Sequence, residues 1–250
     1  MKRKRRRGIH FDREIASQDK DTVARIPRPW VAQHLQRALE GGLLRAYARV
    51  KVDPEAYLRH VRRAHALPIR SWDDMFLVRQ EFVDDLARQT ISAATKLAAL
   101  EGAGLGLGGL LAVLPDASIL SAIVVRLLQK LSLIHGFTYA TEEETAALWL
   151  AAGSAAGLDL GRELVEKEAI ERFVPRLIER ITTKMSAEVC EKWSARMIPL
   201  VSGALGGTLN YYFVREWGRR ARLHFQEKHH AMRGQMSSAA TPALQFPAQD

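Results

Sequence analysis

The chain has 250 residues and a formal net charge of +9, with 47% hydrophobic and 26% charged residues. This length suits one large domain or two small ones, and the composition excludes both a disordered chain and a multi-span transporter. The single cysteine, Cys190, excludes an intramolecular disulfide and a cysteine-based zinc site. We therefore expect a reducing compartment.

The positive charge is concentrated near the two ends of the chain. Met1–Arg7 holds six basic residues, and Arg215–Arg233 holds six against two acids. No apolar segment follows the basic head, as a secretory signal would require, so we expect a cytoplasmic protein. The head is either a solvated tail or a contact with a polyanion. Anionic lipid is favoured over nucleic acid, because no aromatic residues alternate with the basic ones.

The N-terminal third reads as successive helices. Residues 29–39 have helical spacing, and Gly41-Gly42 is expected to end that helix. Asp53-Pro54 predicts an N-cap followed by proline at the first helical position. Ser71 with Asp74 is expected to begin a longer helix that reaches about Glu101.

Helical signals continue through the second half. Thr141 with Glu144 has the form of a capping box. Pro175 is expected to kink or split the periodic, charged segment Asp159–Lys184. No strand is predicted, and the composition of residues 234–250 is typical of a disordered tail.

Three segments carry almost no charge: Gly102–Val125, Thr145–Leu158 and Met197–Val214. Pro115-Asp116 divides the first of them, which predicts a helical hairpin with a turn at that pair. The second arm would run through Arg126, Lys130 and His135. Two interpretations remain open: a buried helical centre, which we favour, and insertion into a membrane. No segment is at once long, charge-free and proline-free, so no stable transmembrane span is expected.

Glycines recur in these segments at spacings that allow close helix packing. A helix with this many glycines gives up stability, which indicates that close contact is needed. Gly104–Gly109 also fits GxGxxG, but a helical segment precedes it, so dinucleotide binding is rejected. The expected packing positions are Gly102, Gly104, Gly106, Gly108, Gly203 and Gly207.

Catalytic patterns such as HExxH, GxSxG and a P-loop are absent from the sequence. Asp116, His135 and Asn210 each interrupt an apolar stretch, so they could form one buried polar site or fill separate structural roles. The structural interpretation is favoured. His229 and His230 lie in a polar stretch and are expected to be solvated. No metal and no cofactor is predicted.

The C-terminal helix combines a basic and an aromatic side. Such a helix either lies at a membrane interface or packs its apolar side into the core. The predicted membrane-contact residues are Arg215, Trp217, Arg219, Arg222 and Phe225.

Two blocks in this order resemble the EcsC protein family. The first has Pro115-Asp116 followed by His135-Gly136-Phe137, and the second has Pro199, Gly203, Gly207 and Asn210. The resemblance covers roughly residues 85–226. It implies an all-helical fold and membrane association, and it assigns no catalytic residue. Because the family is named for a protein encoded beside an ABC transporter, it also allows a role as a scaffold.

The sequence thus predicts an all-α, multi-helix globular domain with a central glycine-rich hydrophobic hairpin and a flexible basic N-terminus. We expect a disordered tail at 1–25, a helical extension at 26–84, an EcsC-like domain at 85–232 and a disordered tail at 233–250. The leading hypothesis is a non-enzymatic protein at the cytoplasmic face of a membrane, with anionic lipid or a membrane protein complex as its partner. The alternatives are a hydrolase of lipids or other amphiphiles that uses the Asp/His/Asn site, and a scaffold for a membrane transporter complex.

Overall fold

The structure is a computed structural model that describes residues 28–105, 113–158, 170–196 and 203–240. Within these ranges every regular element is a helix and there is no strand, which confirms the all-α prediction. In chain order the elements are α2 (Arg28–Arg49), α3 (Pro54–His65), the 3₁₀ helix η1 (Asp73–Leu77), α4 (Gln80–Leu105), α5 (Val113–Ile134), α6 (Glu142–Ala155), α7 (Ile170–Arg196) and α8 (Gly203–Ala240).

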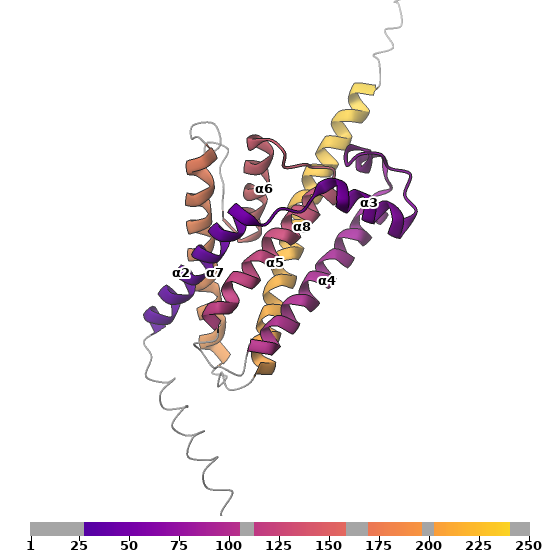
Figure 1. Cartoon of the computed structure of the whole chain (residues 1–250). Helices are drawn as coiled ribbons and strands as arrows, with labels where there is room; N and C mark the ends of the chain where they lie inside the picture. The colour runs from indigo at the N-terminus through magenta and orange to yellow at the C-terminus, as the bar shows by residue number, and fades with distance from the viewer. Residues whose placement is uncertain (1–27, 106–112, 159–169, 197–202, 241–250) are drawn as a thin grey trace, which may run out of the picture.

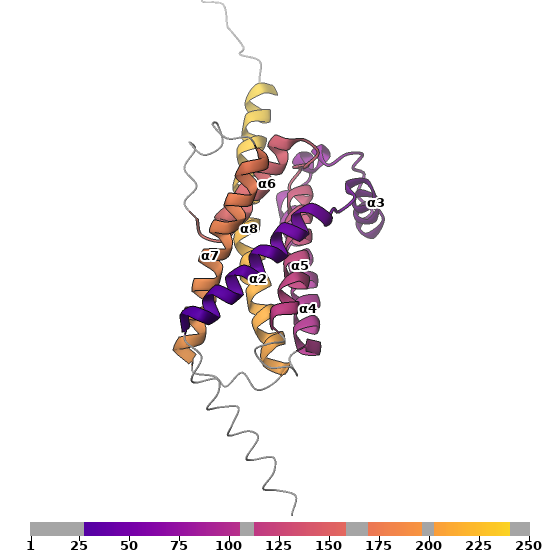
Figure 2. The same ribbon diagram turned by 60° about the vertical axis from the view of Figure 1, so that its left-hand side comes forward.

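The long helices form a bundle. Helix α4 packs along α8 and α5, while α2 crosses α5 and α7, and α6 lies against α7 and α8 (Figures 1 and 2). Helix α3 lies on the side of the bundle away from α7. Helices α4 and α7 end, and α2, α5 and α8 begin, at the same end of the bundle, here called the lower end (Figure 1).

Local capping signals in the sequence correctly mark two helix starts. The Asp53 carboxylate accepts hydrogen bonds from the backbone N–H groups of Glu55 and Ala56, and Pro54 is the first helical residue. Thr141 and Glu144 form the predicted capping box at the start of α6. Both motifs satisfy free N–H groups with side chains only a few residues away, so they can be recognised without the tertiary structure.

Two sites at which the sequence predicted a helix end or a turn lie inside helices. Helix α2 continues through Gly41-Gly42 as far as Arg49, with Gly42 buried in the packing of the bundle. Pro115-Asp116 lies in the first turn of α5, where proline is tolerated because its missing N–H would be unpaired in any case. The predicted hairpin therefore consists of α4 and α5, and the Pro-Asp pair lies within its second arm rather than at a turn.

Proline within the last third of the chain does not divide a helix either. Helix α7 continues past Pro175, whose side chain is exposed. The carbonyl that proline leaves unpaired is four residues earlier and therefore on the same exposed side, where water can bind it.

The helix expected to begin at Ser71 begins later. The carboxylate of Asp74 accepts hydrogen bonds from the N–H groups of Arg70 and Ser71, which forms a turn before η1. The backbone of Val78 is extended, and α4 starts at Gln80.

The C-terminal boundary is also different from the prediction. Helix α8 extends to Ala240, so a disordered tail from residue 233 is wrong for residues 233–240. Arg233 donates a hydrogen bond to the carbonyl oxygen of Val78 at 3.2 Å, which ties this part of α8 to the segment before α4.

The weakly charged segments supply much of the core where the structure describes them. Val124 and Val125 of α5, Trp149 of α6 and Val214 of α8 are almost fully buried. Among the described residues, no helix combines the length and the apolar character that crossing a bilayer requires.

Candidate functional site

The three residues proposed as one polar site are not brought together. Asp116 is in the first turn of α5 and His135 directly follows its last residue, so the two are separated by about 28 Å along the helix axis. Asn210 lies near the start of α8, whereas the part of α8 that contacts His135 is at Phe225 and His229, more than about 20 Å further along. The hypothesis of a hydrolase site built from this trio is therefore wrong.

The five predicted membrane-contact residues on α8 fall into two groups. Trp217 and Phe225 are buried, with 4% and 1% of their surface exposed, so the aromatic side of α8 packs into the core. Arg222 is mostly buried and ion-paired with a residue of α4. Only Arg215 and Arg219 are exposed. Contact of the whole set with a membrane is thus incompatible with this structure, because the aromatic side of α8 faces the core and only the opposite side is exposed.

The predicted packing glycines are only partly described. Gly102 and Gly207 are buried, Gly104 and Gly203 lie within α4 and α8, and Gly106 and Gly108 lie outside the described residues.

A close helix approach occurs at a glycine that the sequence did not single out. A Cβ atom on Gly218 would lie 3.0 Å from Leu127 Cδ2 and 3.1 Å from Ile91 Cγ2, which links α8 to both α5 and α4. Gly218 precedes two arginines in a charged stretch, so no spacing pattern indicates it.

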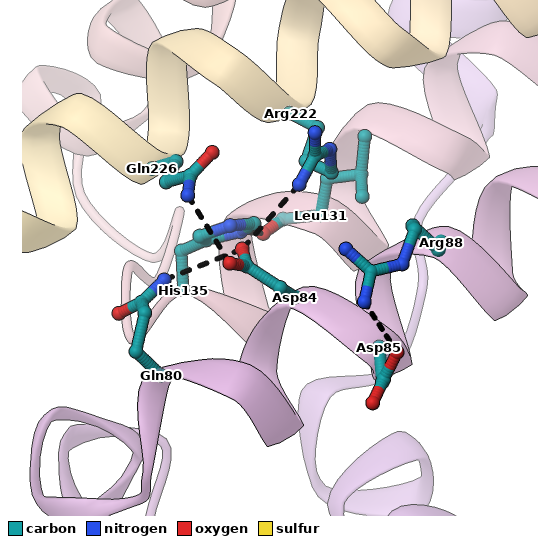
Figure 3. Close-up of polar contacts among 8 residues, drawn as sticks. All are labelled: Gln80, Asp84, Asp85, Arg88, Leu131, His135, Arg222 and Gln226. Carbon is teal, nitrogen blue, oxygen red and sulfur yellow. Dashed lines mark hydrogen bonds and ion pairs between the residues drawn. The ribbon is translucent and has the colours of Figure 1, made fainter.

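A partly buried polar cluster links α4 and α8 around Asp84. Its carboxylate accepts hydrogen bonds from Gln80 Nε2 at 3.3 Å, Gln226 Nε2 at 3.1 Å and Arg222 Nη1 at 3.4 Å (Figure 3). The Arg222 and Asp84 side chains are 17% and 15% exposed, so this ion pair is only weakly screened by water. Asp85 forms a separate, exposed ion pair with Arg88.

Two fully buried histidines lie beside this cluster. His135 Nδ1 donates to the Leu131 carbonyl oxygen at 2.7 Å, and His229 Nδ1 donates to the His135 carbonyl oxygen at 2.9 Å. Burial lowers the pKa of His135 to about 4 and also lowers the pKa of His229, so both rings are neutral at pH 7. Neither Nε2 atom has a hydrogen-bond partner within the described ranges.

The burial of His229 overturns the expectation that it is solvated. The polar residues around it in the sequence face outward, while His229 points to the end of α5 and stacks on Phe76 with the ring centroids 4.9 Å apart. In the part of the chain that the structure describes, no three His, Cys, Asp or Glu side chains converge as a metal site. The hydrogen bond from His229 to the His135 carbonyl links the end of α5 to α8.

A cleft of about 370 Å³ opens between α3, α4 and α5, and we call it the cationic cleft. It contains Arg126, Lys130, His60 and His65, and none of its lining residues is an Asp or a Glu. The remaining lining residues are polar near α3 and apolar further along α4 and α5: Tyr57, Val61, Leu86, Gln89, Thr90, Ala93, Ala94, Leu97, Ile123 and Leu127.

The two strongest cations of this cleft lie one helical turn apart on α5. Among the described residues, neither Arg126 nor Lys130 forms an ion pair. Lys130 Nζ lies 5.1 Å from the centroid of the Tyr57 ring, so an aromatic face holds the ammonium group in place. Burial, and after it the charge of Arg126, lowers the pKa of Lys130.

One pattern in the sequence does indicate this cleft. Arg126 and Lys130 are the only charged residues between Asp116 and Glu142, and they have i,i+4 spacing. Two cations on one side of an apolar helix, with no acid within a turn, indicate an anion-facing position. The contribution of α3 could not be read in this way, because it depends on how α3 folds back on α4 and α5.

An exposed apolar patch continues the cationic cleft towards the lower end of the bundle. It consists of Leu97, Leu100 and Ile119, which are 44%, 73% and 39% exposed. Leu100 follows Leu97 by three residues, and Ile119 precedes the cleft residue Ile123 by four, so each lies on the cleft side of its helix.

A second cleft, of about 340 Å³, has a different character. Its apolar lining includes Phe76, Phe137 and Met232, but Lys228 is accompanied there by Glu144 and Asp73. Glu144 is already engaged, since it accepts hydrogen bonds from Thr138, Ala140 and Thr141. The mixed charge makes this cleft a poorer site for an anion.

The fold and the clefts together define an all-helical bundle with a cationic, apolar-walled cleft and no catalytic constellation among the described residues. The family model of the EcsC protein family matches residues 42–229, and the chain belongs to this family. The match includes all of α3 and the last eight residues of α2, so it begins well before the predicted domain start at residue 85.

One curated protein illustrates the relationship. Protein EcsC of Bacillus subtilis (strain 168) is 29% identical over 147 residues, which is 57% of this chain and 61% of that protein. The chain therefore spans about three fifths of the length of this relative. No solved structure gives a significant match.

Proposed function

We propose that this protein is a non-enzymatic, peripheral membrane protein that binds an anionic membrane surface on its cytoplasmic side. The observation that carries the proposal is the exposed apolar patch of Leu97, Leu100 and Ile119, which lies directly beside the cationic cleft. Apolar side chains with basic residues next to them are the combination that membrane interfaces favour.

The spacing along α5 fits an interfacial position. Arg126 and Lys130 are seven and eleven residues beyond Ile119, which places them about 10 and 16 Å from it along the helix axis. Apolar faces of interfacial proteins enter the boundary between headgroups and acyl chains by about 5–10 Å. With Ile119 at that depth, the two cations reach the level of the lipid phosphates.

The sequence of the connecting segments adds support. The described helices that flank residues 106–112 and 197–202 begin or end at the lower end, as α2 does after residue 27. Both internal segments are uncharged, and the segment before α2 contains the six basic residues of Met1–Arg7. Apolar and basic stretches of sequence thus join the bundle at the end where the patch lies.

Sedimentation with lipid vesicles tests the proposal. We expect the full chain to bind vesicles that contain phosphatidylglycerol and to bind pure phosphatidylcholine vesicles weakly. Binding should fall as salt rises, because the Debye length shortens to about 8 Å at physiological ionic strength. Leu100→Gln with Ile119→Gln should weaken binding at least about tenfold, since two apolar side chains lose their burial in lipid.

Leu77→Gln is the matched control. Leu77 is 75% exposed but lies in η1, before the start of α4 and far from its lower end, so this variant should bind vesicles like the wild type. Equal binding to neutral and anionic vesicles, or equal losses in the patch and control variants, would contradict the proposal. Absence of vesicle binding would favour a membrane protein complex as the partner.

A further inference from the structure

We infer that the cationic cleft binds a single anionic amphiphile, with a phosphate monoester headgroup at Arg126 and Lys130 and an acyl chain along the apolar walls of α4 and α5. This inference deepens the proposed membrane association by naming the lipid chemistry that the protein recognises. The orientation of the bound lipid rests on the proposed function, and the headgroup and chain sites rest on described side chains of α3, α4 and α5.

The headgroup assignment follows from charge. Arg126 and Lys130 are one turn apart on α5, and the cleft lining contains no acid to balance them. Side chains at i,i+4 positions have Cβ atoms about 5–6 Å apart, so one phosphate group can contact both. A phosphate monoester carries close to two negative charges at neutral pH, which matches two cations better than the single charge of a diester.

Neighbouring groups favour the same position for the headgroup. The His60 ring stacks with the Tyr57 ring at a centroid distance of 6.3 Å, and the Lys130 ammonium also contacts the Tyr57 ring. Gln89 adds an exposed amide to the cleft lining. Hydrogen-bond donors and cations therefore gather at the α3 side of the cleft.

The opposite side of the cleft is apolar. From Lys130 towards the start of α5 the lining passes Leu127 and Ile123, and α4 contributes Ala94 and Leu97 at the same side. Lys130 to Ile119 is about 16 Å along the helix, which is the length scale of an acyl chain. The cleft volume of about 370 Å³ lies in the range of about 300–1,000 Å³ typical of small-molecule sites.

The polarity of the cleft also agrees with the membrane orientation proposed above. The cationic part is further from the lower end, and the apolar part leads to the exposed patch of Leu97, Leu100 and Ile119. A lipid in the cleft would have its headgroup away from the bilayer core and its chain pointing into it, as in the membrane itself.

Titration with monomeric short-chain lipids tests the inference without any vesicle. Isothermal titration calorimetry would compare dioctanoyl phosphatidic acid, dioctanoyl phosphatidylcholine and inorganic phosphate, each below the concentration at which the lipids form micelles. We expect saturable one-to-one binding of the phosphatidic acid. The zwitterionic lipid and inorganic phosphate should each bind at least about tenfold more weakly, because the first lacks the charge and the second lacks the chain.

Two kinds of variant localise the site. Arg126→Gln with Lys130→Gln should weaken phosphatidic acid binding at least about tenfold by removing both cations. The matched control is Arg172→Gln with Arg180→Gln, which removes the same charge from exposed positions on α7, on the far side of the bundle from α3. Ala93→Trp fills the apolar part from an exposed position and should reduce binding without changing any charge.

The outcomes separate this inference from the proposed function. If the Arg126/Lys130 variant binds phosphatidic acid like the wild type, or the α7 control loses as much, the inference is overturned even where vesicle binding persists. If inorganic phosphate binds as tightly as the lipid, the cleft is a phosphate site and the amphiphile assignment fails. If monomeric lipid binds as expected but vesicles do not, the inference stands and the peripheral membrane role fails.

Discussion

Substitution of Gly136 by alanine tests how tightly the end of α5 is packed. Gly136 has a φ of +84°, and its N–H donates to the Leu133 carbonyl while the N–H of Phe137 donates to Ser132, which closes the helix. This left-handed conformation is one that glycine adopts without strain. An added Cβ would also lie 2.7 Å from Phe76 Cε2 and 2.8 Å from Phe76 Cζ.

The expected loss of stability combines two effects. The left-handed backbone costs a residue with a Cβ about 1–2 kcal/mol. The clash adds about 1–3 kcal/mol, because overpacking displaces a ring that cannot move freely. Phe76 is held by Phe137 and His229, whose ring centroids are 5.5 and 4.9 Å away. We therefore expect Gly136→Ala to lower the free energy of unfolding by about 2–5 kcal/mol.

Urea unfolding followed by circular dichroism measures this loss, and Gly157→Ala separates its two parts. Gly157 has a φ of +75°, but its nearest contact from the added Cβ would be Lys184 Cε at 3.9 Å, which is ordinary contact. This control should lose only the backbone term of about 1–2 kcal/mol. Equal losses in the two variants would refute the argument that Phe76 is fixed against Gly136.

Three further predictions concern the rest of the bundle. In thermal unfolding, Gly218→Leu should destabilise the protein by about 1–3 kcal/mol through overpacking. Gly234→Leu on the same helix is the control: an added Cβ there would have nothing within 4 Å, so stability should be unchanged or rise by up to about 1 kcal/mol. Asp84→Ala should cost about 2–4 kcal/mol in urea unfolding, because it leaves Arg222 mostly buried without its carboxylate, and Asp84→Asn should cost less. His135 has a native pKa of about 4 against an ordinary 6.5, so the unfolded state takes up a proton first as pH falls. The contribution of His135 to the free energy of unfolding should be constant above about pH 7 and should fall by up to about 3 kcal/mol as the pH is lowered from 6.5 to 4. In the His135→Phe variant, the free energy of unfolding should change less over this pH range.

The features that the sequence predicted correctly are those that neighbouring residues determine. The cap at Asp53 and the capping box at Thr141 and Glu144 depend on groups within one helical turn. The family resemblance was likewise carried by contiguous motifs, and the family match confirms it.

The incorrect predictions depend on which surface a helix meets. Trp217 and Phe225 have the spacing of an amphipathic helix, and that spacing is the same for a helix on a membrane and a helix in a bundle. His229 lies among polar residues in the sequence, yet it is buried because α8 crosses the end of α5 there. The prediction that a helix ends at Gly41-Gly42 was wrong for a related reason: packing against α5 and α7 stabilises α2 across these two glycines.

The cationic cleft also combines residues that a local sequence pattern indicates with residues that only the tertiary structure brings there. The pair Arg126 and Lys130 can be recognised from its spacing in an otherwise uncharged stretch. His60 and Tyr57 could not be assigned to it, because 47 residues separate the end of α3 from the start of α5 and no local pattern relates the two helices. A cleft formed by three helices requires their tertiary arrangement.

The most direct test of membrane recognition through the cationic cleft is sedimentation with vesicles that contain phosphatidic acid. The wild type and the Arg172→Gln/Arg180→Gln variant should bind these vesicles equally well and bind phosphatidylcholine vesicles weakly. The Arg126→Gln/Lys130→Gln variant, which has the same net charge as the α7 variant, should lose at least about nine tenths of its affinity for the anionic vesicles. Equal binding by the two charge variants would contradict the account, because net charge rather than the cleft would then determine attachment.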